Sequence, residues 1–259
     1  MSSNPYAAPK SAVADVVRET IDGDFIPEGQ RVSIGNAWPW ITEGWRLFRE
    51  QPGMWIGGLL LVFVILMVIA FIPYLGVILM ALLYPIFGGG LMLGADSVWK
   101  TGSMEFGHFF AGFRNRFGAL AIVGLLFMVC SIAINVLIAS IAGLEPTYFF
   151  NPGTEVPEGL DWKLYWLATL TGLAIWVPIY AAMWFAPALI LLNGMGVGEA
   201  LKTSFFACFK NFLPFLLYSI LLTLITIVSA IPLLLGLFIT MPLWVITIYT
   251  AYRDIFYST

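Results

Sequence analysis

The sequence predicts an all-α fold: a polytopic membrane protein with six transmembrane helices, arranged as three hairpins that each follow a cytoplasmic interfacial amphipathic helix. Composition is the first reason, because 60% of the 259 residues are hydrophobic, only 10% are charged, and the mean hydropathy is +0.92. Soluble domains are roughly half apolar and a quarter charged. The other two reasons are long uncharged stretches and a short aromatic and basic segment that recurs along the chain.

Four stretches contain no charged residue, at 51–95, 117–144, 164–198 and 211–252. A helix needs about 20 apolar residues to cross a hydrocarbon core about 30 Å thick, so the first and last stretches each hold two crossings and the middle two hold one each. Proline and glycine divide the longer stretches near 73–76 and 232–236, and Pro178 and Pro187 predict kinks in the fourth helix. The predicted transmembrane helices are about 53–73, 76–97, 118–143, 164–190, 213–232 and 235–253.

The distribution of basic residues predicts the orientation. In the six-helix layout, eleven of the twelve lysines and arginines flank one side and only Lys163 lies on the other. Basic residues near helix ends resist translocation, so both termini are expected in the cytoplasm. Residues 1–35 are expected to form a disordered or extended polar cytoplasmic tail, and 36–259 a single membrane domain. The NPYAAP segment at 4–9 is either part of that disordered tail or a short motif that docks on a cytoplasmic partner.

Three segments at the predicted cytoplasmic interface have the periodicity of amphipathic helices. Two of them, FFAGFRN at 109–115 and FFACFKN at 205–211, share five of seven residues, and GWRLFRE at 44–50 is a looser match. We therefore expect three parallel repeats around a pseudo-threefold axis. Rings with cationic neighbours suit the headgroup region, including anionic lipids. The expected lipid- or partner-binding residues are Trp45, Arg46, Phe48, Arg49, Phe109, Phe113, Arg114, Arg116, Lys202, Phe205, Phe209 and Lys210.

Small and polar residues inside the apolar stretches have two interpretations. Gly88, Gly89 and Gly90, followed by Gly94, favour close helix packing, but they also fit a helix that opens around a transported solute. Asn135 is expected to form an interhelical hydrogen bond or to line a polar pathway. No ionisable residue lies deep in a predicted helix, and no spacing fits a triad or metal site. We expect no catalytic residue, metal or cofactor, and no nucleic-acid partner, since there is no basic run.

Several segments resemble a known family. They are GWRLFREQPGMWIGG (44–58), IPYLG (72–76), YPIFGGGLMLGAD (84–96), FGHFFAGFRNRFG (106–118) and MWFAPALILL (183–192). They resemble uncharacterised six-helix inner-membrane proteins of proteobacteria that carry a domain of unknown function, over roughly 35–258. More distantly, the chain is similar to the membrane domains of some glycerophosphodiester phosphodiesterases, without their catalytic domain. The resemblance implies a bacterial inner-membrane location and a fold, but no activity.

Three functions fit these features. The favoured one is a non-enzymatic membrane module or accessory subunit that binds lipids, including anionic ones, or a membrane or cytoplasmic protein partner through its interfacial helices and its tail. The alternative is a small transporter or channel for a neutral or apolar solute. A lipid enzyme would need an acid and base pair at the interface, for which only Asp96, Glu199 and His108 are available.

Overall fold

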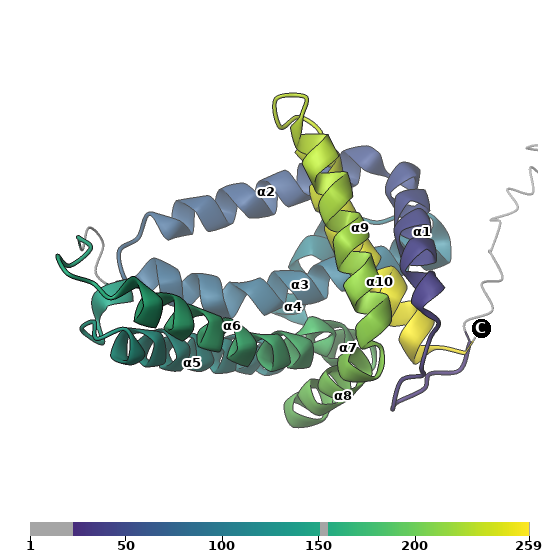
Figure 1. Cartoon of the computed structure of the whole chain (residues 1–259). Helices are drawn as coiled ribbons and strands as arrows, with labels where there is room; N and C mark the ends of the chain where they lie inside the picture. Colours follow the sequence, from purple (N-terminus) through teal and green to yellow (C-terminus); the bar gives the residue numbers. More distant parts are fainter. Residues whose placement is uncertain (1–22, 151–154, 259) are drawn as a thin grey trace, which may run out of the picture.

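The computed structural model describes residues 23–150 and 155–258, and these residues are almost entirely helical (Figure 1). A short 3-10 helix, η1 (Ile34–Asn36), leads into α1 (Ala37–Glu50), α2 (Pro52–Ala70) and α3 (Leu75–Thr101), which cover the first predicted unit. The second predicted unit covers η2 (Phe106–Phe110), α4 (Ala111–Arg114), α5 (Phe117–Ile141), η3 (Tyr148–Phe150), α6 (Trp162–Trp184) and α7 (Ala186–Leu192). The third covers α8 (Val197–Lys210), α9 (Phe212–Ala230) and α10 (Leu237–Phe256).

Five helical segments in the described part of the chain are long and apolar enough to cross a membrane: α2, α3, α5, α9 and the combined α6–α7 segment Trp162–Leu192. The chain is therefore an all-helical polytopic membrane protein. The sixth predicted crossing, 235–253, corresponds to α10, which is not among the five. Twelve of its twenty residues are buried, and its second half carries Arg253 and Asp254, so it is less apolar than the others. The sixth crossing stays a prediction.

The helices lie in two groups. In Figure 1, α3, α5 and α6 run alongside one another, and α2 stands apart from α3 over most of its length. Only Trp55, Gly58 and Val62 of α2 are buried. The hairpin of α9 and α10 runs steeply across the first group in this view, with its tip at 231–236 projecting away. The pseudo-threefold arrangement of three hairpins stays a prediction.

The turns follow the proline and glycine signals. The first hairpin turns at 71–74, where Tyr74 has a φ of 59°, and the last turns at 231–236, where Leu233 and Leu234 have φ of 50° and 64°. Left-handed backbone at residues other than glycine costs about 1 kcal/mol or more each. The sequence predicts two kinks in the fourth helix. At Pro178 the helix α6 continues, whereas the helix is interrupted at Phe185, two residues before Pro187.

The second interfacial segment differs from the expected helix of about a dozen residues. It forms the 3-10 helix η2 and the four-residue helix α4 instead, packed against α3. Glycines make this approach possible, because a Cβ added at Gly90 would lie 2.6 Å from the carbonyl oxygens of His108 and Phe109. Phe109 occupies the space left by Gly58 of α2 and is fully buried. The segment is therefore a packing element between α2 and α3.

Candidate functional site

The described ends of the chain meet at one end of the molecule, which we call the basal end. Residues 23–33 form an extended strap, and Phe25 pairs with Tyr257 in an antiparallel bridge. The backbone N–H of Ile26 donates to the Phe256 carbonyl at 2.7 Å, and the N–H of Gln30 donates to the Ile255 carbonyl at 2.8 Å. This part of the expected tail is extended but packed on the domain, so the domain begins before residue 36. Residues 1–22, including NPYAAP, lie outside the described residues.

The strap also holds the corner between α8 and α9. The buried Asn211 accepts a hydrogen bond from the backbone N–H of Val32 at 2.8 Å, and its amide donates to the Gln30 carbonyl at 2.9 Å. The adjacent Lys210 donates from Nζ to the Gly29 carbonyl at 2.7 Å. Three hydrogen bonds of two consecutive residues, Lys210 and Asn211, therefore fix this corner against the strap.

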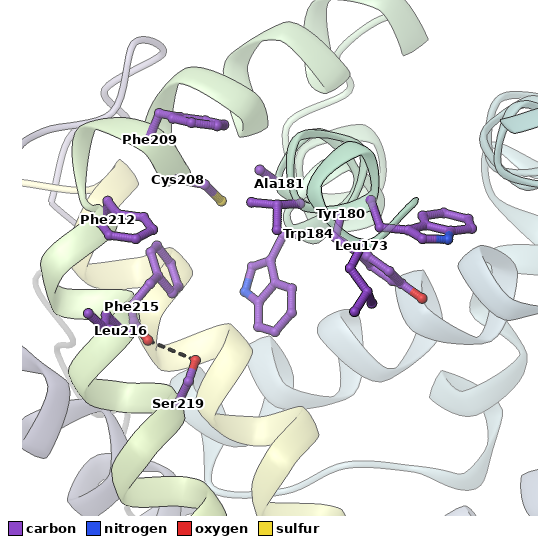
Figure 2. A pocket seen from close by; sticks show the side chains of 12 residues that line it. Leu173, Tyr180, Ala181, Trp184, Cys208, Phe209, Phe212, Phe215, Leu216 and Ser219 are labelled. Carbon is purple, nitrogen blue, oxygen red and sulfur yellow. Dashed lines mark hydrogen bonds between the residues drawn. The ribbon is translucent and has the colours of Figure 1, made fainter. Parts of the chain in front are cut away.

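An apolar groove opens beside this corner, between α6, α8 and α9 (Figure 2). Its volume is about 660 Å³, within the range of small-molecule sites. Ser219 is one of its few polar groups, and its hydroxyl is already used, donating to the Phe215 carbonyl at 2.8 Å. The lining residues are Leu173, Trp176, Val177, Tyr180, Ala181, Trp184, Cys208, Phe209, Phe212, Phe215, Leu216 and Ser219. Desolvation by burial raises the pKa of the Cys208 thiol to about 12, so this thiol is neutral at physiological pH.

One buried serine, Ser204, holds the break between α6 and α7, next to the groove residue Ala181. At the break between α6 and α7, the backbone N–H of Phe185 donates to Ser204 Oγ at 3.0 Å, and that hydroxyl donates to the Ala181 carbonyl at 2.7 Å. In a continuous helix, the Phe185 N–H would bond directly to the Ala181 carbonyl. Ser204 of α8 is therefore inserted into the ladder of α6, a recognised cause of a kink.

The basic residues expected at the interface are mostly on the surface. Arg49, Arg114, Arg116, Lys202 and Lys210 are all exposed. The Arg116 guanidinium donates to the Gly194 carbonyl at 2.9 Å.

Arg46 is half-buried and bonded within the protein. It pairs with Glu43 at 2.7 Å and with Glu50 at 3.4 Å, and its guanidinium lies 5.1 Å from the Trp99 ring centroid. Arg46 therefore already has protein partners, unlike a residue held for a ligand.

The aromatic members of the expected site divide into two groups. Trp45, Phe113 and Phe209 are exposed, and Phe205 is half-buried against Phe209. Phe48 and Phe109 are only 4% and 0% exposed. The expectation that Phe48 and Phe109 contact lipid or a partner is wrong, because both pack inside the protein.

The glycines and Asn135 also have definite roles. Gly88, Gly89, Gly90 and Gly94 lie in the unbroken helix α3, so the prediction of an opened helix is wrong. Close packing holds for three of them: at Gly89 and Gly94, as at Gly90, an added Cβ would come within 3.2 Å of a neighbouring element. Asn135 Nδ2 donates at 2.9 Å to the Ser131 carbonyl one turn earlier in α5, so the expected interhelical bond is replaced by one within its own helix.

Two carboxylates that the sequence analysis did not single out for this role connect α10 to α1 and α3. Asp254 Oδ2 accepts hydrogen bonds from Trp40 Nε1 at 2.7 Å and from Asn36 Nδ2 at 2.9 Å. Asp96 accepts from the Tyr249 hydroxyl at 2.9 Å and pairs with Lys100, also at 2.9 Å. The i, i+5 spacing of Tyr249 and Asp254 within an apolar helix was the available signal. Each carboxylate serves to attach α10 to its neighbours.

Another link runs from α7 to α10. The Tyr252 hydroxyl donates to Asn193 Oδ1, and Asn193 Nδ2 donates to the Tyr257 hydroxyl at 3.1 Å. Asn193 thus connects the end of α7 to the C-terminal end of α10. Within 23–150 and 155–258, no three His, Cys, Asp or Glu side chains gather in a way that could hold a metal ion.

Comparison with known proteins adds a distant relative. No family model matches the chain, and no solved structure matches it. Nothing in these comparisons supports the likeness to glycerophosphodiesterase membrane domains. Over 198 residues, the chain is 25% identical to a protein of Burkholderia thailandensis named as a probable inner membrane protein, an alignment that covers 73% of each chain.

Proposed function

We propose that this chain is a non-enzymatic module of the bacterial inner membrane that binds anionic lipid at its basal end. The observation that carries the proposal is a set of exposed cations beside exposed aromatic rings: Arg49, Arg114, Arg116, Lys202 and Lys210. Lys210 is bonded to Gly29 of the strap, and Arg116 is bonded to Gly194, which follows the Tyr257 partner Asn193. Each lysine or arginine near an anionic membrane surface contributes about 1 kcal/mol. The name of the Burkholderia thailandensis relative supports the location.

The proposal includes six crossings with both termini in the cytoplasm, and the three repeats. The pairing of Phe25 with Tyr257 supports an even number of crossings, because both described ends lie together. The exposed basic residues support the assignment of this end to the cytoplasm. A reporter fused after the last residue checks it: green fluorescent protein is expected to fluoresce there, and alkaline phosphatase activity at that position would contradict the orientation.

A role as accessory subunit to a protein partner belongs to the same proposal, through the N-terminal tail. The non-enzymatic assignment is supported by two of the three candidate acids and bases, which are hydrogen-bonded within the protein. Asp96 is bonded to Tyr249, and His108 Nδ1 accepts from the backbone N–H of Glu105 at 2.8 Å. The glycine segment of α3 is unbroken and packed, which takes away one of the features that favoured the transporter alternative.

Retention of phosphatidylglycerol tests the proposal. The full chain is purified in detergent with an equal mixture of phosphatidylglycerol and phosphatidylcholine, and bound lipid is measured by native mass spectrometry. Combined Arg114→Glu and Lys202→Glu substitutions are expected to lower the preference for phosphatidylglycerol. Lys163→Glu, at the opposite predicted side, is the matched control and is expected to keep it. Equal lipid retention by both variants would contradict lipid binding at the basal end.

A further inference from the structure

The groove between α6, α8 and α9 lies where its occupant must be apolar. Both α6 and α9 are candidate membrane spans, and their facing walls carry Leu173, Val177 and Leu216 among the twelve lining residues. Figure 2 shows rings from both helices directed toward the same space. Since the groove lies between two candidate membrane spans, hydrocarbon from the bilayer is its expected neighbour, and water is a poor occupant of such a lining.

The length of the groove corresponds to one leaflet. On α6, its lining runs from Trp184, near the basal end, to Leu173, which is eleven residues or about 16 Å at the helical rise of 1.5 Å per residue. On α9 it runs from Phe212 to Ser219, about 10 Å. Half of a hydrocarbon core of about 30 Å is about 15 Å. The groove therefore extends from the basal interface to about the middle of the membrane and no further.

In the chain, a positive charge follows directly on the groove wall formed by α8. Lys210 is not itself a lining residue, but in the sequence it lies between Phe209 and Phe212, which both line the groove, and its side chain is exposed. Its ammonium has three donors, of which one is used by the Gly29 carbonyl at 2.7 Å. The mouth of the groove beside α8 therefore suits a negatively charged group at the level of the lipid phosphates.

The wall of the groove also contains a donor without an acceptor. Trp184 Nε1 is buried and has no hydrogen-bond partner among the described residues. Its indole projects into the space between α6 and α9 in Figure 2. Tryptophan is enriched at membrane interfaces, where its ring is apolar and its N–H meets polar lipid groups.

We infer that this groove holds one acyl chain of an anionic glycerophospholipid from the basal leaflet, with the lipid phosphate at Lys210. The inference rests on the proposed function, which it deepens by assigning a single site. The occupant is a lipid, because the depth and the apolar lining of the groove suit an acyl chain and the charge at the mouth suits a phosphate.

Photocrosslinking of the full chain in nanodiscs tests the inference. The probe is phosphatidylglycerol with a diazirine in its acyl chain, diluted in unlabelled phosphatidylcholine, and crosslinked peptides are mapped by mass spectrometry. Crosslinks are expected to concentrate on 173–184 and 209–219. Ser219→Trp, which fills the inner end of the groove, is expected to reduce them to the level seen on α5. Ala133→Trp, at an exposed position on α5 outside the groove, is the matched control and is expected to leave them unchanged.

A second pair of variants keeps the test valid if Ser219→Trp does not fold. Lys210→Met is expected to lower the preference of the groove for phosphatidylglycerol over phosphatidylcholine by about fivefold, the share of one cation near an anionic surface. Lys210→Arg is expected to restore it. Labelling spread evenly over α2, α5 and α6, or a preference unchanged in Lys210→Met, would overturn the site. So would groove residues that crosslink to a second copy or to another protein.

The two proposals fail separately. If charge reversal at Arg114 and Lys202 lowers the preference for phosphatidylglycerol but the groove is never labelled, the groove is not the site and the basal end still binds lipid. If charge reversal has no effect while the groove is labelled and depends on Lys210, lipid binding is confined to the groove and the broader basic face is refuted.

Discussion

Replacing Ser204 with alanine tests how the groove is built. The Ser204 hydroxyl occupies the gap in the α6 ladder, accepting from the Phe185 N–H and donating to the Ala181 carbonyl, and both Ser204 and Phe185 are fully buried. Ser204→Ala removes both hydrogen bonds without adding bulk. The direct bond between Phe185 and Ala181 cannot simply re-form, because the ring of Pro187 occupies the space near the Met183 carbonyl that a straight helix needs.

The expected loss of stability follows from these two bonds. A buried backbone group left without a partner costs about 1–3 kcal/mol. Interhelical hydrogen bonds in membrane proteins contribute less on average, about 0.6 kcal/mol and at most about 1.7. Partial relaxation of the kink will recover some of the loss at Ser204. We expect Ser204→Ala to lower the free energy of unfolding by about 1–2 kcal/mol.

Reversible unfolding in mixed micelles, followed by circular dichroism, measures this difference. The matched control is Ser140→Ala on α5, whose hydroxyl is exposed and donates to the Val136 carbonyl of its own helix at 2.7 Å. The control is expected to change stability by no more than about 0.5 kcal/mol. If Ser204→Ala and Ser140→Ala unfold at the same denaturant fraction, the inserted hydroxyl does not hold the break, and the reasoning is refuted.

Three further predictions concern packing, the strap and the thiol. Gly90→Ala should strongly reduce the yield of monodisperse protein in gel filtration, since its Cβ would lie 2.6 Å from two carbonyl oxygens. The control Gly57→Ala, with open space around it, should be neutral or stabilising. Equal yields of the two variants would refute the packing role of Gly90. Asn211→Ala should release the strap and accelerate tryptic cleavage after Arg31, and an unchanged cleavage rate would show that the strap holds without it. In a Cys130→Ala background, Cys208 should resist iodoacetamide at pH 8, because a raised pKa near 12 leaves only about one thiolate in ten thousand. The rate of alkylation should rise only as the pH approaches the pKa of the thiol. Rapid reaction at pH 8 would contradict the burial of Cys208.

The sequence predicted the helices well because their ends depend on local features. Charged clusters limit the apolar stretches, and the α2 and α3 bounds at Pro52–Ala70 and Leu75–Thr101 differ by a few residues from the predicted 53–73 and 76–97. The turn at Pro73 follows from the missing N–H and the fixed φ of proline. Such features need no knowledge of the partner helix.

The candidate site was harder to predict because periodicity identifies an apolar face without identifying what covers it. Phe48 and Phe109 have the spacing of interfacial rings, but α10 and the Gly58 site of α2 cover them. The strap depends on pairings between residues about 180 to 230 positions apart, such as Val32 with Asn211. Long-range contacts of this kind have no local sequence signal, so neither the strap nor the groove beside it was predictable.

The two most similar aromatic and basic segments differ at two positions, and the packing around one of them differs clearly. In FFAGFRN, a Cβ at Gly112 would overlap the Ile86 backbone of α3, so only glycine lets this segment pack so closely against α3. In FFACFKN, the equivalent position is Cys208, whose side chain lines the groove instead. α8 still packs against α6, and the Cys208 side chain forms part of the groove wall beside that contact. The same motif therefore packs closely on α3 through a glycine at 109–115, and lines the groove through a cysteine at 205–211.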